Sequence, residues 1–131
     1  MHTVLPRRIS AVVAIVGLAV GLSACDSVVS IVPMASCTTG KSFCYKPAMV
    51  SVASGTKVIF KNNTTVIHTV TRCATPACPV SGGTGSDTGF GSPGTIPAGG
   101  TYAFVFHGKG TYVYYCQIHG YGIMHGTITV T

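Results

Sequence analysis

The chain has 131 residues, of which 47% are hydrophobic and only 8% are charged, with eight Lys and Arg against two Asp and Glu. This length accommodates one small domain, and two carboxylates exclude the paired-acid and Ser-His-Asp arrangements on which many hydrolases depend. The basic residues are scattered and no aromatic-plus-basic motif accompanies them, which excludes a typical nucleic-acid-binding protein.

Residues 1 to 24 have the composition of an export signal. Arg7 and Arg8 precede an uncharged run of 14 residues, Ile9 to Leu22, which is too short to cross a hydrocarbon core of about 30 Å as a helix. The pattern predicts a signal peptide, followed by a single domain over residues 25 to 131. The arginine pair is also found in twin-arginine signals, but its neighbours match that signal poorly.

The signal ends in Leu22-Ser23-Ala24-Cys25, which resembles the lipobox of bacterial lipoproteins. The match predicts that the Cys25 thiol accepts a diacylglycerol after cleavage. The protein would then be exported and anchored as a lipoprotein to the outer face of the cell membrane, on the periplasmic or extracytoplasmic side. The alternative is an ordinary signal peptide cleaved nearby, with Cys25 as an unmodified thiol.

The chain that follows the signal is basic. Its net charge is +4, because six Lys and Arg face only Asp26 and Asp87, and 6 − 2 = 4. The six are Lys41, Lys46, Lys57, Lys61, Arg72 and Lys109. This balance suits an acidic partner surface or anionic headgroups, and an ordinary solvated surface is the alternative.

From residue 28 onwards the chain consists of short runs rich in Val, Ile, Thr, Tyr and Phe, bounded by Gly, Pro and Asn. Such runs predict strands. We expect them at Val28 to Val32, Val50 to Val52, Lys57 to Asn62, His68 to Thr71, Thr101 to His107, Gly110 to Cys116 and Gly126 to Thr131. About seven to eight short strands in roughly 100 residues, with no sustained helical period, predict an all-β fold, an antiparallel β-sandwich.

Two stretches lack strand character, a short one at 33 to 44 and a Gly-, Ser- and Thr-rich one at 79 to 100. Two pairs of cysteines lie in or beside them. In an exported protein, pairs so close in sequence predict disulfides between Cys37 and Cys44 and between Cys73 and Cys78. Loop-closure entropy makes each worth roughly 2 to 2.5 kcal/mol. Cross-pairing is the alternative, but local pairing needs no long-range assumption.

The segment from Tyr112 to Gly126 concentrates metal donors. It places Cys116, His119 and Met124 within nine residues, so that a loop between adjacent strands can turn all three side chains towards one point. A fourth donor must come from elsewhere, and His68, in the run Val66 to Thr71, is the best candidate. Each residue alone would more often belong to a core, but the four together predict a metal site.

The donor set favours copper. A thiolate and two imidazoles with a weak thioether suit both oxidation states of copper, so that little atomic movement accompanies loss or gain of an electron. Zinc is the rival because Cys and His also suit it, but a thioether adds little to that ion. His107 and His125 are not assigned to the site, since the first precedes a turn and the second is expected to point away.

A wider pattern surrounds these donors. The segments that carry it are Tyr45 to Val52, Gly55 to Asn62, His68 to Thr71, Ser92 to Gly94, Ala98 to Tyr102 and Gly110 to Cys116, followed by Cys-x2-His-x4-Met and a final Thr-Ile-Thr-Val strand. Together they resemble the cupredoxins, blue copper proteins of the plastocyanin, pseudoazurin and halocyanin group. The resemblance covers about residues 28 to 131, and it implies a Greek-key sandwich.

The resemblance implies one type 1 copper ion, with His68, Cys116 and His119 in its plane and Met124 as the axial contact. It also implies a monomeric carrier of single electrons. The neighbours of His119, Gly120 to Ile123, lack charge, so we expect its ring edge to emerge through an apolar patch where redox partners dock. Thr69 stands where plastocyanins place Asn, so that a hydrogen bond to the thiolate would rely on a backbone N–H or a hydroxyl.

Two other functions are possible for a copper site in a chain of this length. A module that stores or delivers copper is the alternative, although such proteins usually use exposed Met-rich or His-rich sites. An enzyme such as a multicopper oxidase fragment would need further copper ligands, and His2, His107 and His125 do not form His-x-His pairs. We therefore expect a protein without catalytic activity, tethered to the membrane through its lipid anchor.

Overall fold

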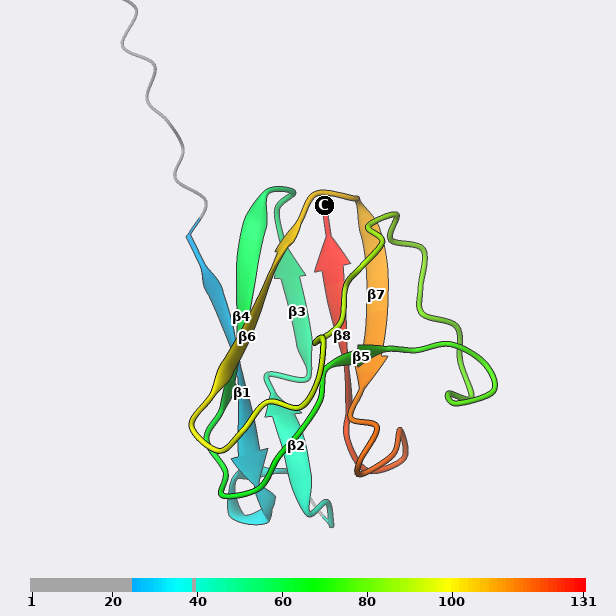
Figure 1. The fold of residues 1–131 in the computed structure, drawn as a ribbon. Coiled ribbons are helices and arrows are strands. Elements are labelled where there is room, and N and C mark those ends of the chain that lie inside the picture. The colour runs from blue at the N-terminus through cyan, green and yellow to red at the C-terminus, as the bar shows by residue number, and fades with distance from the viewer. Residues whose placement is uncertain (1–24, 39) are drawn as a thin grey trace, which may run out of the picture.

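Eight strands form two four-stranded sheets in the described part of this computed structural model, residues 25–38 and 40–131 (Figure 1). They are β1 (Ser27–Pro33), β2 (Phe43–Lys46), β3 (Met49–Val52), β4 (Thr56–Asn62), β5 (Thr71–Arg72), β6 (Thr101–Phe106), β7 (Gly110–Tyr115) and β8 (His125–Val130). One turn of 3-10 helix, Met34–Ser36, follows β1. The predicted signal peptide lies outside the described residues.

The two sheets have the strand orders β2-β1-β4-β6 and β3-β8-β7-β5. The predicted all-β sandwich is thus confirmed, but its sheets are mixed rather than wholly antiparallel. Strand β1 pairs in parallel with β4, and β3 pairs in parallel with β8. Composition indicates that a segment is a strand, but it does not indicate which neighbour the segment joins or in which direction.

Two strands differ from the expectation. β2 was not predicted, since it is only four residues long and begins inside the predicted turn region; it pairs antiparallel with β1, from Ser30 opposite Lys46 to Pro33 opposite Phe43. The run from His68 to Thr71 was expected to be a strand, but β5 contains only Thr71–Arg72, and His68 forms an isolated bridge with Ile96.

The core lies between the sheets and is rich in aromatic rings. Alternate residues of β4 point into it, among them Val58 and Phe60, and neither is exposed. The Phe60 ring lies edge-on to that of Tyr114 on β7, with 5.3 Å between centroids. Such pairs add roughly 0.5 to 1.5 kcal/mol to the burial of the rings themselves. This packing fixes the strands whose ends carry the site.

The sandwich has two distinct ends. The upper end in Figure 1 holds the start of β1, the β3–β4 turn and the C-terminus, where Ser54 N–H donates to the carbonyl of Thr131 at 3.1 Å. The lower end holds the β1–β2 connection, the loop 116–124 after β7 and the segment 62–68 after β4. Cysteine 116 and the N-terminal strand's first residue therefore lie at opposite ends of the molecule.

The long loop 79–100 runs over the surface, as predicted, but it is held firmly. The Arg72 guanidinium donates to the carbonyls of Gly82, Gly85 and Asp87 at 3.1, 2.7 and 2.8 Å. It also lies 4.9 Å above the ring of Tyr112. A side chain at Gly85 would clash with that ring, so the close approach of the loop to β7 requires glycine.

Both predicted disulfides are found in the structure. Cys37 joins Cys44 across the β1–β2 connection, and Cys73 joins Cys78 just after β5, with Cα–Cα distances of 5.8 and 5.4 Å. Each bridge closes a short loop, as expected from the sequence spacing.

Within residues 25–38 and 40–131, no helix is both long and apolar enough to span a bilayer.

Candidate metal centre

The loop 116–124 is a compact turn that begins and ends at two predicted ligands. Cys116 N–H donates to the carbonyl of Met124 at 3.0 Å, which ties the two ends of the loop together. Gly120 donates to the carbonyl of Cys116 at 2.9 Å, and Met124 N–H donates to that of Gly120 at 3.0 Å. The φ angle of Gly120 is +80°, a left-handed conformation that favours glycine.

His68 reaches the same place from the other side of the fold. Its backbone pairs with that of Ile96 through two hydrogen bonds of 3.1 and 2.7 Å. The turn that precedes it is held by the side chain of Asn62, whose amide donates to the carbonyls of Val66, Ile96 and Pro97 at 2.8, 3.0 and 3.0 Å. A buried polar side chain thus fixes the backbone that carries this ligand.

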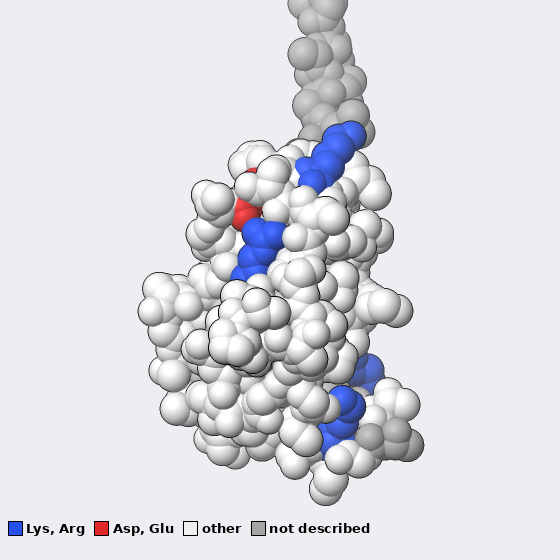
Figure 2. Space-filling view, turned by 90° about the vertical axis from the view of Figure 1, so that its right-hand side faces the viewer, with Lys and Arg blue, Asp and Glu red and all other residues white. Residues whose placement is uncertain are grey.

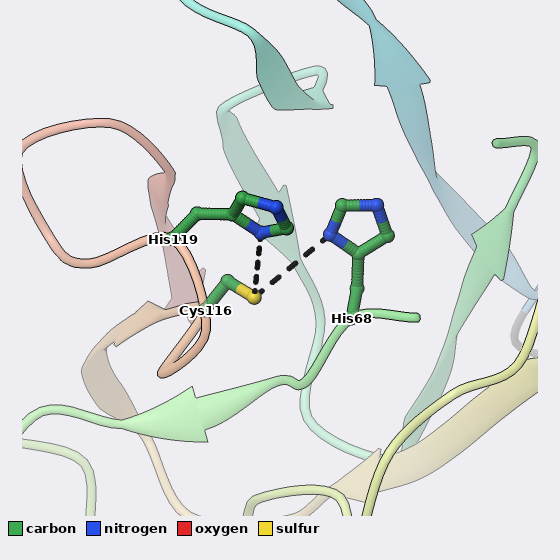
Figure 3. A group of neighbouring side chains, drawn as sticks. All are labelled: His68, Cys116 and His119. Atoms are coloured by element: carbon green, nitrogen blue, oxygen red, sulfur yellow. Dashed lines mark hydrogen bonds between the residues drawn. The ribbon is translucent and has the colours of Figure 1, made fainter. Parts of the chain in front are cut away.

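Figure 3 shows the two imidazoles turned towards the thiol of Cys116. The Nδ1 atom of His68 lies 3.8 Å from Sγ, and Nδ1 of His119 lies 3.4 Å from it. The three donor atoms all lie within 4.8 Å of one another, and His68 and Cys116 are 0% exposed. Among residues 25–38 and 40–131 these are the only three His, Cys, Asp or Glu side chains grouped closely enough to hold a metal ion.

The fourth predicted ligand, Met124, ends the same loop, and its side chain is fully buried in the cluster that includes Cys116. The two histidines that were left out of the predicted site are absent from the group. His107 lies in the β6–β7 turn at the upper end. His125 stacks on Tyr121 with 4.3 Å between ring centroids, and its Nδ1 lies 2.7 Å from the carbonyl of Tyr121.

Thr69 connects the two chain segments that supply the ligands. Its backbone N–H donates to Sγ of Cys116 at 3.4 Å, as the sequence led us to expect in the absence of asparagine. Its hydroxyl accepts a hydrogen bond from the N–H of Gln117 at 2.9 Å. Hydrogen bonds to a thiolate stabilise its charged form and fix its position.

Thr64 orients the ring of His68, a role that sequence reasoning missed. The Thr64 hydroxyl donates to Oδ1 of Asn62 at 2.7 Å and lies 2.9 Å from Nε2 of His68. Because the hydroxyl proton is directed at Asn62, we assign the imidazole proton to Nε2. The lone pair of Nδ1 then points towards Cys116, as a metal ligand requires.

Phe43 was also missed, because β2 was not predicted. Its ring lies 4.8 Å from the ring of His68 and 4.8 Å from that of His119, between centroids. The next residue, Cys44, is held by the disulfide to Cys37. The hairpin β1–β2 therefore places an apolar ring against both imidazoles.

The surroundings keep both imidazoles neutral near pH 7. Burial, and to a smaller extent the neighbouring His119, lower the pKa of His68 to about 4. Burial also lowers the pKa of His119. Neutral imidazoles are the form that binds metal ions.

These donors suit copper. A buried thiolate, two neutral imidazoles and a thioether match the three-plus-one donor set of blue copper sites, whereas zinc gains little from a thioether. The ligand atoms are already gathered by hydrogen bonds of the protein itself, so the residues fit the ion that the sequence predicted.

Comparison with known proteins agrees with this geometry. Residues 33–131 match the family described as copper binding proteins, plastocyanin/azurin family. A plastocyanin of Lactuca sativa is 37% identical over 89 residues, which span 66% of this chain and 86% of that protein.

Solved structures of other proteins share the fold. The chain is similar to a purple cupredoxin from Nitrosopumilus maritimus, with a TM-score of 0.60, 25% identity and coverage of 81% of this chain and 100% of that one. A reduced amicyanin mutant has a TM-score of 0.56 at 22% identity, over 81% and 82% of the two chains. The chain belongs to the plastocyanin/azurin family of copper-binding proteins, and His68, Cys116, His119 and Met124 form its type 1 copper site.

Proposed function

We propose that the protein carries single electrons between redox partner proteins and catalyses no reaction itself. Bound copper would supply the one-electron chemistry by alternating between Cu(II) and Cu(I). The observation that carries this proposal is the buried group of His68, Cys116 and His119, whose donor atoms lie within 4.8 Å of one another.

The protein's own contribution is to hold these side chains still. Thr69 restrains the thiol of Cys116, and Thr64 restrains the ring of His68. A site whose ligands are fixed by the surrounding structure need not rearrange when the charge of its ion changes, and this keeps electron transfer fast.

The lower end also suits brief contacts with other proteins. The segments that carry His68 and His119 expose several apolar side chains, and the loop 117–123 has no charged residue. The most exposed of them are Ile67 at 49% and Ile118 at 48%. Contact through apolar side chains avoids the cost of stripping water from charges, which supports docking near His119.

Storage or delivery of copper is the alternative function. It is disfavoured by burial, since His68, Cys116 and Met124 are 0% exposed. An ion held by buried ligands exchanges slowly, whereas delivery requires ligands that a recipient protein can replace. We therefore favour the carrier.

The decisive experiment is to load the purified domain with Cu(II) and record its visible spectrum and a voltammogram. We expect an intense thiolate-to-copper band near roughly 600 nm and a reversible one-electron wave. Cys116→Ser should abolish the band while circular dichroism of the fold is preserved, because the core and disulfides do not depend on the thiol. A colourless complex, or a band retained in the variant, would refute the proposal.

We further propose that Cys25 is lipidated and tethers the domain to the outer face of the cell membrane. The proposal is supported by the resemblance of Leu22-Ser23-Ala24-Cys25 to a lipobox. Cys25 is also exposed and forms no disulfide. Expression of the full chain should yield a membrane-bound protein whose mass includes a diacylglycerol. Cys25→Ala should release it into the soluble fraction, and a wild-type chain that is soluble after export would refute the tether.

A further inference from the structure

A pocket of about 370 Å³ lies at the lower end, beside the loop 116–124. Its lining includes Lys41, from the segment before β2, and Lys46, the last residue of β2, together with Ile123 and His125. Ile123 and His125 directly flank the ligand Met124. We call this the lysine pocket; it adjoins the copper site without including any of its ligands.

The two lysines of this pocket carry charges that no carboxylate neutralises. Lys41 Nζ donates to the carbonyl of Gly122 at 2.8 Å, and Lys46 Nζ donates to that of Ser36 at 3.2 Å. Each bond uses one of the three N–H groups of an ammonium, and both acceptors are uncharged. Donors and positive charge therefore remain available on both lysines.

The only two carboxylate side chains of the sequence lie at the upper end. Asp26, next to the start of β1, pairs with Lys57 at 2.9 Å. Asp87 accepts hydrogen bonds of 2.9 Å from the N–H groups of His107 and Gly108 in the β6–β7 turn. On the face of the molecule that Figure 2 shows, the lower part has blue groups and no red one. The copper end of the protein therefore carries lysine charges and no carboxylate side chain.

We propose that the lysine pocket receives a carboxylate side chain of an acidic redox protein and so orients that partner over the loop 116–124. This inference rests on the proposed function, because it names the class of partner. Opposite charges that meet next to the site of transfer raise the rate of productive encounters more than they raise affinity. The walls of the pocket would also fix the position of the partner's carboxylate.

The test compares two oxidants of opposite charge by stopped-flow absorption of the Cu(I)-loaded protein at low ionic strength. The anion is ferricyanide and the cation is tris(phenanthroline)cobalt(III). We expect Lys41→Gln/Lys46→Gln to slow oxidation by ferricyanide about fivefold and to leave the cationic oxidant equally fast or faster. High salt should remove the difference.

The matched control is Lys57→Gln/Lys109→Gln, which removes the same net charge at the upper end. It should change either rate less than about twofold. Because Lys41 also holds the carbonyl of Gly122, Lys46→Gln alone is the second variant, and it should slow ferricyanide by a smaller factor with an unchanged visible band. Equal slowing by both double variants would overturn the inference.

A protein arm distinguishes a docking site from a small-anion site. An acidic and a basic c-type cytochrome serve as electron acceptors, and only transfer to the acidic one should slow in Lys41→Gln/Lys46→Gln. If ferricyanide responds and the acidic cytochrome does not, the pocket takes small anions only and the inference is wrong. If wild-type copper protein shows no reversible one-electron cycle, the proposed function fails instead.

Discussion

The side chain of Thr64 shows how a single hydroxyl can prepare a metal ligand. Replacing it in Thr64→Val keeps the size but leaves Nε2–H of the buried His68 without its acceptor at 2.9 Å. We expect copper affinity to fall about 10- to 100-fold, the usual cost of losing a partner that orients a ligand. Competition titration against a chelator measures it. Thr64→Ser should retain most of the affinity, and equal losses in both variants would show that packing matters and not the hydroxyl.

Phe43 acts on the same site through its surface. Phe43→Ala removes a ring that lies 4.8 Å from both imidazoles and lets water approach them. Water stabilises Cu(II), the more highly charged state, so we expect the reduction potential to fall by tens of millivolts. Protein-film voltammetry measures the shift. Phe43→Leu, which keeps an apolar cover, should shift it less, and an unchanged potential in Phe43→Ala would contradict this role.

At the scale of elements, the hairpin β1–β2 is stapled by the Cys37–Cys44 disulfide beside Phe43. Replacing both cysteines by Ala should cost roughly 2 to 2.5 kcal/mol of unfolding free energy and also shift the copper spectrum, because Phe43 is released. Replacing Cys73 and Cys78 should cost a similar amount and leave the spectrum closer to that of wild type. Urea unfolding and visible absorption measure both effects. Equal spectral changes would show that the first bridge has no special relation to the site.

Asp87, in the long loop 79–100, predicts that the unfolding free energy depends on pH. Burial by itself raises the pKa of Asp87, but hydrogen bonds from Gly108, Tyr112 and His107 outweigh it, and the pKa lies below its ordinary value. A lowered pKa contributes stability above the ordinary pKa of Asp, and this contribution is lost as pH falls through the lower pKa of the folded state. We expect Asp87→Ala to lose about 1 to 2 kcal/mol at pH 7 and less at pH 3.

Urea unfolding of the copper-free protein at the two pH values measures this difference. Asp26→Ala is the control, since Asp26 belongs to an exposed pair with Lys57, with 44% of each side chain accessible. Asp26→Ala should change the unfolding free energy little at pH 7. A loss in Asp87→Ala that is the same at both pH values would show that the carboxylate charge is not involved.

Strands in which apolar and polar residues alternate could be predicted from the sequence. Strands whose limits depend on contacts with distant segments could not. β6 and β8 have clear alternation and were found at nearly the expected positions. β2 owes its existence to pairing with β1, and β5 is short because the backbone near His68 bonds to Ile96 of the long loop instead. Such choices depend on which strand lies alongside, which a local pattern does not encode.

For the whole molecule, the same distinction separates the ligands from their supports. Three ligands lie in one short loop, so their spacing alone indicated the site, and His68 was found because it begins a recognisable segment. Thr64 and Phe43 contact the site only after β4 and the β1–β2 hairpin have been brought to the lower end. Their identities carry no metal signal, and only packing shows what they do.

The distance between the two ends of the sandwich determines how far a lipid anchor on Cys25 would hold the copper site from the membrane. Only Asp26 stands between Cys25 and the first residue of β1, and a seven-residue strand spans about 23 Å. An acyl chain on Cys25 would therefore hold the upper end against the headgroups and keep the metal at a stand-off of about that length. Under this geometry, electrons would be exchanged with water-soluble proteins or with tall extramembrane domains, and a donor confined to the bilayer plane would be too far away.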